Sequence, residues 1–242
     1  MKYVVGLLAI ISIVACKQTR QKEEPKSYFC SPQLEAFFSG ADSLPVIEFE
    51  YDDSLSLIKE RLAQLIDTNT TSQDYFIFFK IKYTIDSGIS PIYLKVYIDN
   101  PFPAFLPPYC GLRQEVEIAI NNDGLYLVEG EIGDSSSIRN ITYKNITNNG
   151  KDVSLSSNPR WALSSINWDY GAPKVQFDAA IEAILNGYTE VINDASFKKF
   201  NKEFCLLTPI EGGEILSEYN FNLKLRYREL EYQKFALDTI IN

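Results

Sequence analysis

The segment that begins at Pro173 constrains the fold most strongly, because it carries a long apolar stripe at helical spacing. Proline suits the first turn of a helix, where its missing N–H is not needed. The apolar positions that share one side of this helix are Phe177, Ile181, Ile184, Leu185, Tyr188, Val191 and Ile192. An amphipathic helix gains most of its stability by packing this side against another layer. The pattern predicts a helix that covers a sheet, with residues 193–204 continuing it after a kink.

Runs rich in aromatic and β-branched residues predict the strands of that sheet. We place them at 46–51, 75–85, 92–98, 115–120, 125–128, 161–168 and 221–227. Asn121-Asn122-Asp123-Gly124 joins two of these runs, and Asp-Gly favours a hairpin with a type I′ turn. In the run 92–98, the aliphatic residues face one way and Tyr93, Lys95 and Tyr97 face the other. Weaker helical patterns lie at 54–66, 135–148 and 210–219.

These elements predict an α+β protein with mixed or antiparallel sheets and helices packed on one face, as a two-layer sandwich. We expect two halves of similar size, at 28–112 and 113–242. The second half has the order hairpin, helix, strand, helix, strand. Because no Gly/Ser-rich linker separates the halves, we expect one continuous body.

The N-terminus predicts export and a lipid anchor. Lys2 precedes an apolar run that is too short for a membrane span, which needs about 20 apolar residues. The run ends in Ile13-Val14-Ala15-Cys16, which resembles a bacterial lipobox. The resemblance implies a signal peptide at 1–15 and lipid on Cys16. Residues 17–26 are polar, charged and without periodicity, which predicts a flexible tether at 16–27. The alternative is an uncleaved anchor or an ordinary signal peptide. Lys17 follows the lipidated position, where Asp would indicate inner-membrane retention, so the outer membrane is favoured.

Composition excludes several function classes. The chain has 242 residues, a formal charge of −9 and no histidine. Without histidine, Ser-His-Asp and Cys-His catalysis and the usual zinc sites are ruled out. The net negative charge argues against nucleic acid as a partner. Ser56–Lys59 and Ser196–Lys199 match Ser-x-x-Lys, but a pattern this loose arises by chance. The sequence therefore predicts no enzyme, no cofactor and no metal.

Cysteine content leaves the disulfide question open. If lipid occupies Cys16, three cysteines are left: Cys30, Cys110 and Cys205. An exported protein can form disulfides, so at most one bridge forms among these three. Their spacing does not select the pair. Buried unpaired thiols are the alternative.

The segment 100–111 (NPFPAFLPPYCG) is the most unusual stretch of the chain. Its four prolines forbid a helix or a central strand. Phe102, Phe105 and Tyr109 would be displayed along an extended backbone, as in a loop that contacts a partner. The alternative is a crossing loop whose aromatic rings cover the end of the core.

Two passages in the second half resemble the periplasmic domain of the ExbD/TolR family of energy-coupling proteins. One is the hairpin at 118–128, with its central Asp-Gly, and the other is the strand, Asp and helix passage at 166–181. The resemblance implies a fold that dimerises or contacts other envelope proteins. Family members carry an acidic residue in a transmembrane helix, and the apolar segment Tyr3–Ala15 has none, so proton coupling is not implied.

Two functions follow from the sequence. The first is a non-enzymatic envelope lipoprotein that binds another envelope protein or a second copy of itself. The alternative is a lipoprotein that binds a glycan or peptide on aromatic side chains near 100–110 and 161–170, because rings of Trp and Tyr stack well on ligands.

Overall fold

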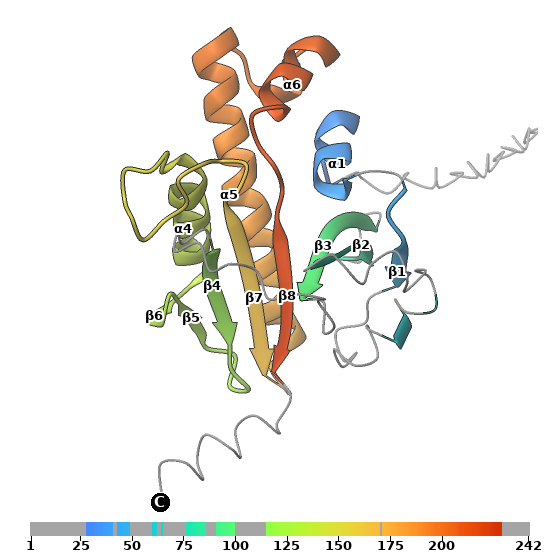
Figure 1. The fold of residues 1–242 in the computed structure, drawn as a ribbon, viewed down its shortest axis with the longest axis vertical. Coiled ribbons are helices and arrows are strands. Elements are labelled where there is room, and N and C mark those ends of the chain that lie inside the picture. The colour runs from blue at the N-terminus through green and yellow to red at the C-terminus, as the bar shows by residue number, and fades with distance from the viewer. Residues whose placement is uncertain are drawn as a thin grey trace, which may run out of the picture.

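The computed structural model describes residues 28–40, 43–48, 60–61, 64, 76–85, 91–99, 115–169 and 171–228 (Figure 1). The strands in these ranges form one eight-stranded sheet in the order β1-β2-β3-β8-β7-β4-β5-β6. The strands are β1 (Val46–Glu48), β2 (Phe76–Tyr83), β3 (Ile92–Asp99), β4 (Glu115–Ile120), β5 (Tyr126–Val128), β6 (Glu131–Gly133), β7 (Leu163–Asp169) and β8 (Leu223–Arg228). The helices are α1 (Pro32–Ser39), α4 (Ser135–Thr147), α5 (Lys174–Phe200), the 3₁₀ turn η1 (Phe204–Leu206) and α6 (Pro209–Leu216). The predicted α+β class is confirmed.

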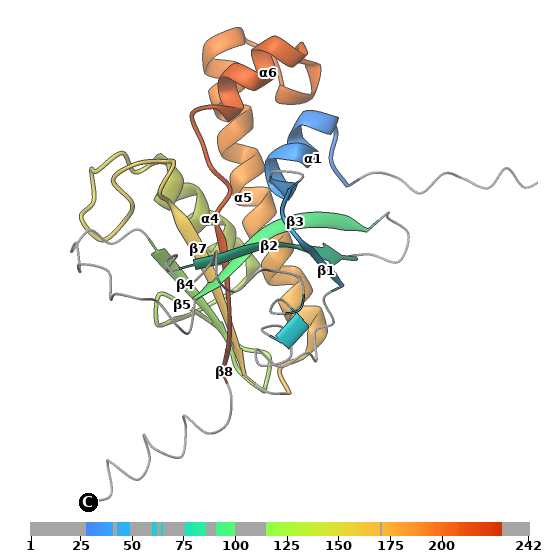
Figure 2. The ribbon, with the colours of Figure 1, turned by 45° about the vertical axis from the view of Figure 1, so that its right-hand side comes forward.

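The sheet is mixed, and the last strand of the chain lies near its centre. β8, β7 and β4 are parallel, whereas β4–β5, β5–β6 and β2–β3 are antiparallel. β3 meets β8 through the pair Tyr97↔Lys224, and Figure 2 shows β2 and β3 running across the direction of β8. The two expected halves at 28–112 and 113–242 therefore share one sheet through this contact.

α4 and α5 pack side by side against one face of the parallel strands. α5 is one helix from Lys174 to Phe200, so the predicted continuation past Asn193 is present but ends at Asn201 and does not reach residue 204. Its buried Phe177 meets the rings of Trp168 on β7 and Tyr83 on β2. Gly187 lets the two helices approach closely, because a Cβ there would lie 2.9 Å from the carbonyl oxygen of Arg139 on α4.

The β4–β5 hairpin forms where predicted, but its turn is not type I′. That turn needs positive φ at both central residues, and only Gly124 has a positive φ, at 80°. The N–H of Gly124 donates to the carbonyl of Asn121. The Asn121 side chain also accepts from the backbone N–H groups of Asp123 and Leu125. This local hydrogen bonding stabilises a longer loop than the two-residue turn.

α1 was not predicted from the sequence. Ser31 caps it by accepting from the N–H of Leu34, Pro32 occupies its first turn, and Gly40 ends it at φ 69°. Its buried Phe38 contacts the rings of Phe29 and Phe221 at centroid distances of 4.9 and 4.8 Å. These contacts fix α1 beside the start of β8. In the range 54–66, the described residues Glu60, Arg61 and Gln64 are helical, as expected.

Candidate functional site

Within the part of the chain that the structure describes, the candidate site is a groove between α1 and the strands β1–β3, which we call the lysine groove. Its volume is about 450 Å³, which is within the range of small-ligand pockets. The residues that line it are Pro32, Glu35, Ala36, Ser39, Val46, Lys80 and Tyr93. α1 supplies one wall, and the three strands supply the floor.

Strand pairing explains why these side chains converge. Val46 on β1 is directly opposite Lys80 on β2, and Lys80 is opposite Lys95 on β3. Residues directly opposite in a sheet project from the same face. Tyr93 lies two residues before Lys95 and shares that face. The apolar positions between them, such as Leu94 and Ile81, are buried on the other side.

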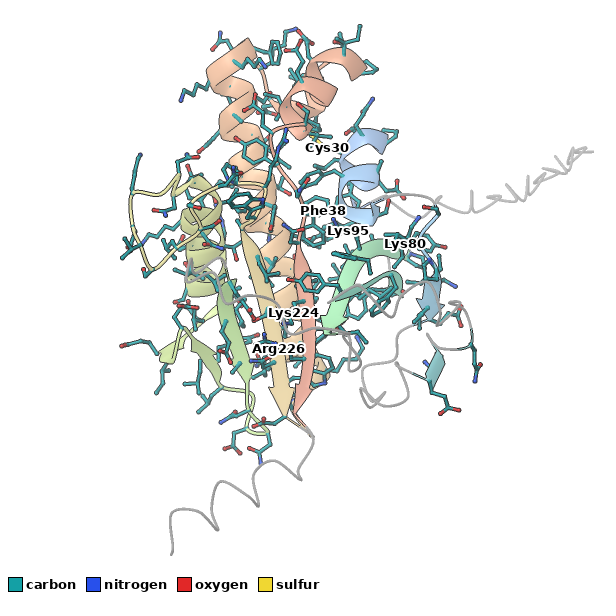
Figure 3. All side chains as sticks on the ribbon, in the orientation of Figure 1. Cys30, Phe38, Lys80, Lys95, Lys224 and Arg226 are labelled. Carbon is teal, nitrogen blue, oxygen red and sulfur yellow. A yellow bond between two sulfur atoms is a disulfide. The ribbon has the colours of Figure 1, made fainter. Side chains whose placement is uncertain are left out.

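Lys80 lines the groove, and Lys95 on β3 is directly opposite Lys80 in the sheet. The side chain of Lys80 is only 7% exposed. The stem of Lys95 runs beneath the end of α1, where a Cβ on Gly40 would lie 2.8 Å from its Cδ. Figure 3 shows both lysines just below α1.

Lys95 is electrostatically unusual. Burial holds the pKa of Lys95 below its usual value, because the charged form loses hydration. Its ammonium nitrogen lies 5.9 Å from the ring centroid of Phe78. It forms no salt bridge with any residue in the described ranges. Lys82, by contrast, is paired with Glu48 at 2.9 Å on the same face.

The groove also has an apolar wall. Val46 and the ring of Tyr93 remain 45% and 36% exposed, and Pro32 and Ala36 face them from α1. Glu35 of α1 supplies one carboxylate to the lining. A bound molecule would thus meet one lysine side chain, apolar surface and one carboxylate. The lining thus combines charged and apolar groups, as ligand-binding pockets do.

A second polar feature continues across the sheet from the groove. Lys224 on β8 is 4% exposed and lies opposite Ser165 on β7. Asn167 donates from its side chain to Glu117 on β4, and Arg226 forms a salt bridge with Glu115. The Ser165 hydroxyl and the Asn167 side-chain oxygen are buried and have no hydrogen-bond partner among the described residues. Figure 3 shows Lys224 and Arg226 along β8, below Lys95.

The structure places the predicted cysteines as follows. Cys30 and Cys205 form a disulfide, which selects one of the pairings that the sequence left open. Cys16 and Cys110 lie outside the described residues, as do Phe102, Phe105 and Tyr109 of the proline-rich segment.

An aromatic surface was expected near 161–170, of which Tyr170 lies outside the described residues. Trp168 is buried in the core, where it packs on Phe177. Trp161 is 53% exposed in the loop before β7. Trp168 falls on the same face of β7 as the buried Ile166.

The Ser-x-x-Lys match on α5 makes no catalytic pair. The buried hydroxyl of Ser196 donates to the carbonyl of Lys202 at 2.6 Å. Lys199 is instead paired with Glu214 and Glu218. The Ser56–Lys59 match lies outside the described residues. Within the described ranges there is no cluster of three or more metal-ligating side chains, and no helix is long and apolar enough to cross a membrane.

Comparison with known proteins gives no family assignment: no protein-family model, no curated protein and no solved structure matches this chain.

Sequence reasoning placed Tyr93 and Lys95 on one face of a strand but did not find the groove. The groove exists only because α1 lies over that face. The available signals were Ser31-Pro32 as a helix start and Gly40 as a helix end. The helix between Ser31 and Gly40 has only eight residues, which are too few to show a clear apolar period.

Proposed function

We propose that this chain is a lipid-anchored protein of the bacterial cell envelope, whose domain is a non-catalytic module that docks onto another envelope protein. The lipobox at Cys16 supports the anchor. The Cys30–Cys205 disulfide supports an oxidising compartment, where such bonds persist. The order of elements from β4 to β8 supports the resemblance to the periplasmic part of ExbD/TolR-type proteins, without their proton coupling.

The observation that carries this proposal is the edge of the sheet at β6. Among the described residues, β6 pairs only with β5. Ile132 on β6 is 79% exposed, and it lies opposite Leu127, which is also exposed. An open strand edge with apolar side chains is a template for a partner strand. Because Glu131 is exposed on the same strand, the partner we propose is an extended apolar segment flanked by basic residues.

The test is photo-crosslinking in intact envelopes. A photoreactive phenylalanine at position 132 should give an adduct with a second protein, identified by mass spectrometry. The matched control is position 153, because Val153 is 94% exposed in the loop after α4. Equal adducts at the two positions, or none at 132, would refute the docking edge. An adduct of twice the chain's mass would identify the partner as a second copy.

The anchor is tested separately. Cys16→Ala should abolish lipid attachment and remove the adduct at position 132 if docking occurs at the membrane. If the mature wild-type protein has the mass of the polypeptide alone, with no added lipid, the anchor is refuted. The second candidate function is binding of a glycan or peptide, and the lysine groove is the observation that favours it.

A further inference from the structure

We propose that the end of the domain formed by α5, η1 and α6 lies on the membrane surface, with Phe197, Leu206 and Ile210 inserted among the lipids. We call these three side chains the apolar tip. The inference rests on the lipid anchor of the proposed function, because the anchor is what holds the domain near a bilayer. It adds which face of the domain meets the membrane, and the anchor by itself does not determine that face.

The apolar tip consists of large side chains that are exposed to solvent. Phe197, Leu206 and Ile210 are 48%, 69% and 78% exposed. Leu206 belongs to η1, and Ile210 belongs to the first turn of α6. Phe197 follows Asn193 by one helical turn, and the side-chain oxygen of Asn193 accepts from the N–H of Phe204, the first residue of η1, at 3.1 Å. Since residues four apart on a helix are neighbours, all three side chains belong to the same end of the domain.

The segment that carries the tip has a fixed shape. The ring of Phe204 is buried under α6, where a Cβ on Gly212 would lie 3.5 Å from it. Thr208 and Glu211 form a capping box that starts α6 and so sets the position of Ile210. A surface that is already ordered loses less entropy when it binds.

The charged side chains around the tip include two lysines that are neutralised by glutamates. Lys202 forms a salt bridge with Glu211 at 3.1 Å. Lys199 pairs with Glu214 at 3.1 Å and with Glu218 at 3.6 Å. The whole chain has a formal charge of −9, so an anionic bilayer would not attract the domain through charge. The contact therefore relies on insertion of apolar side chains at the boundary between headgroups and acyl chains.

The length of the tether supports a bilayer as the occupant of this surface. Tyr28 is the first described residue, and it follows Cys16 by 12 positions. A flexible chain of this length has a root-mean-square end-to-end distance of roughly 20 Å. α5 has 27 residues, so it is about 40 Å long. The tether is thus shorter than the domain, and the end of the domain at which the tether enters is held nearest the lipids.

The disulfide identifies that end. Cys30 follows the tether and is bonded to Cys205, with the two Cα atoms 5.7 Å apart. Leu206 of the apolar tip comes directly after Cys205. Figure 3 labels Cys30 between α1 and α6, and Figures 1 and 2 show α6 and the end of α5 projecting beyond the sheet. The tether therefore joins the domain beside the apolar tip.

The test uses the full lipidated chain in phosphatidylcholine vesicles and compares two isoleucines of equal exposure. Ile210→Trp places a fluorescent ring at the tip, and Ile132→Trp places one on β6, where Ile132 is 79% exposed. With lipids brominated near the headgroup end of their acyl chains, the emission of the added ring should fall by roughly half at position 210. It should not fall at position 132. The wild-type chain supplies the background emission of Trp161 and Trp168.

Further variants assign the contact to the tip. Phe197→Trp is a second reporter and should be quenched in the same vesicles. Adding Leu206→Ser and Ile210→Ser to this reporter should remove most of the quenching. The matched changes Leu127→Ser and Ile132→Ser, at exposed positions of β5 and β6, should leave it unchanged. Every variant should still float with the vesicles, because the acyl chains hold it there, and thermal melts will show that each is folded.

The outcomes separate this inference from the proposed function. A wild-type chain that does not float with the vesicles refutes the anchor and this inference with it. A chain that floats without quenching at position 210, or with equal quenching at 132 and 210, overturns the membrane contact and leaves the anchor intact. Quenching that requires added phosphatidylglycerol would overturn apolar insertion, because charge would then cause the contact.

A protein is the other possible occupant of the tip. If a photoreactive phenylalanine at position 210 crosslinks to a protein in envelopes, and no quenching occurs in vesicles, the tip binds that protein and the membrane contact is overturned. Loss of the adduct at position 132, with quenching at position 210 intact, would refute only the docking edge.

Discussion

Cys30 and Cys205 are joined by a disulfide that brings together residues 175 positions apart, with their Cα atoms 5.7 Å from each other. Cys30 lies just before α1, and Cys205 lies in η1, between α5 and α6. The bond therefore closes almost the whole domain into one loop. Cross-links that close long loops restrict the unfolded chain most, although the measured gains in stability vary.

The first prediction concerns this bond. Replacing both cysteines, as Cys30→Ser with Cys205→Ser, should lower the free energy of unfolding by about 2–5 kcal/mol. The Phe29, Phe38 and Phe221 contacts should still hold α1 in place, so the fold is retained. Urea unfolding monitored by circular dichroism measures the loss. Peptide mapping without reduction should recover the 30–205 bridge, and a bridge that contains Cys110 would contradict the assignment.

The second prediction concerns the stability cost of Lys95. Burial lowers the pKa of Lys95, so between that pKa and 10.5 the unfolded state binds more protons than the folded state. The charged form therefore destabilises the fold at neutral pH, and this cost disappears as the pH rises towards 10.5. Lys95→Met should raise the free energy of unfolding at pH 7 by on the order of 1 kcal/mol, allowing for partial exposure.

The pH dependence distinguishes this effect from simple packing. The gain from Lys95→Met should shrink between pH 7 and pH 10 in parallel urea titrations. Lys198→Met serves as the control, because Lys198 is exposed. If the increase in the free energy of unfolding does not depend on pH, side-chain packing causes it, and desolvation of the Lys95 ammonium does not.

The third prediction compares two helical glycines. Gly187→Ala should lower the free energy of unfolding by about 1–3 kcal/mol, because the new Cβ would collide with the backbone oxygen of Arg139 on α4. Gly213 in α6 is exposed, and a Cβ there meets no atom within 4 Å. Gly213→Ala should therefore stabilise by about 0.5–1 kcal/mol through helix propensity. Thermal unfolding of both variants measures the contrast, and shifts of the same sign would contradict it.

The fourth prediction concerns the contact of Tyr143 with Asp194. The Tyr143 hydroxyl on α4 donates to the Asp194 carboxylate on α5 at 2.7 Å, and this bond raises the pKa of Tyr143 to about 12. Since the folded pKa exceeds the unfolded value of 10.0, the stabilisation is complete below pH 10 and is lost as the pH rises through 12. Tyr143→Phe should cost about 0.5 kcal/mol at pH 8.

Spectroscopic titration provides the measurement for this contact. Phenolate absorbance should show one late-titrating tyrosine fewer in Tyr143→Phe than in the wild type. Asp194→Asn should shift the titration of Tyr143 towards 10, because it removes the negative charge that opposes ionisation. An unchanged titration in Asp194→Asn would contradict the role of this carboxylate.

Local patterns predicted much of the fold. The stripe from Phe177 to Ile192 gave α5, and the alternation from Ile92 to Ile98 gave β3 with the correct buried face. The hairpin of β4 and β5 was also predicted, although the side chain of Asn121 determined its turn. These elements are predictable because their signals lie within a few residues of one another.

Long-range relationships were not predictable from such patterns. The order of strands requires β8 to enter between β3 and β7, and no local signal encodes that choice. The lysine groove requires α1 to lie over β3, which is more than fifty residues away in the chain. The selection of Cys205 as the partner of Cys30 depends on the same tertiary arrangement.

The position of β8 also determines when the protein can fold. β8 pairs with both β3 and β7, so the sheet has no bridge between its two parts until residues 223–228 are present. In the chain these residues follow the other seven strands of the described sheet. A nascent chain therefore carries the residues of β1 to β7 before it contains the strand that joins β3 to β7.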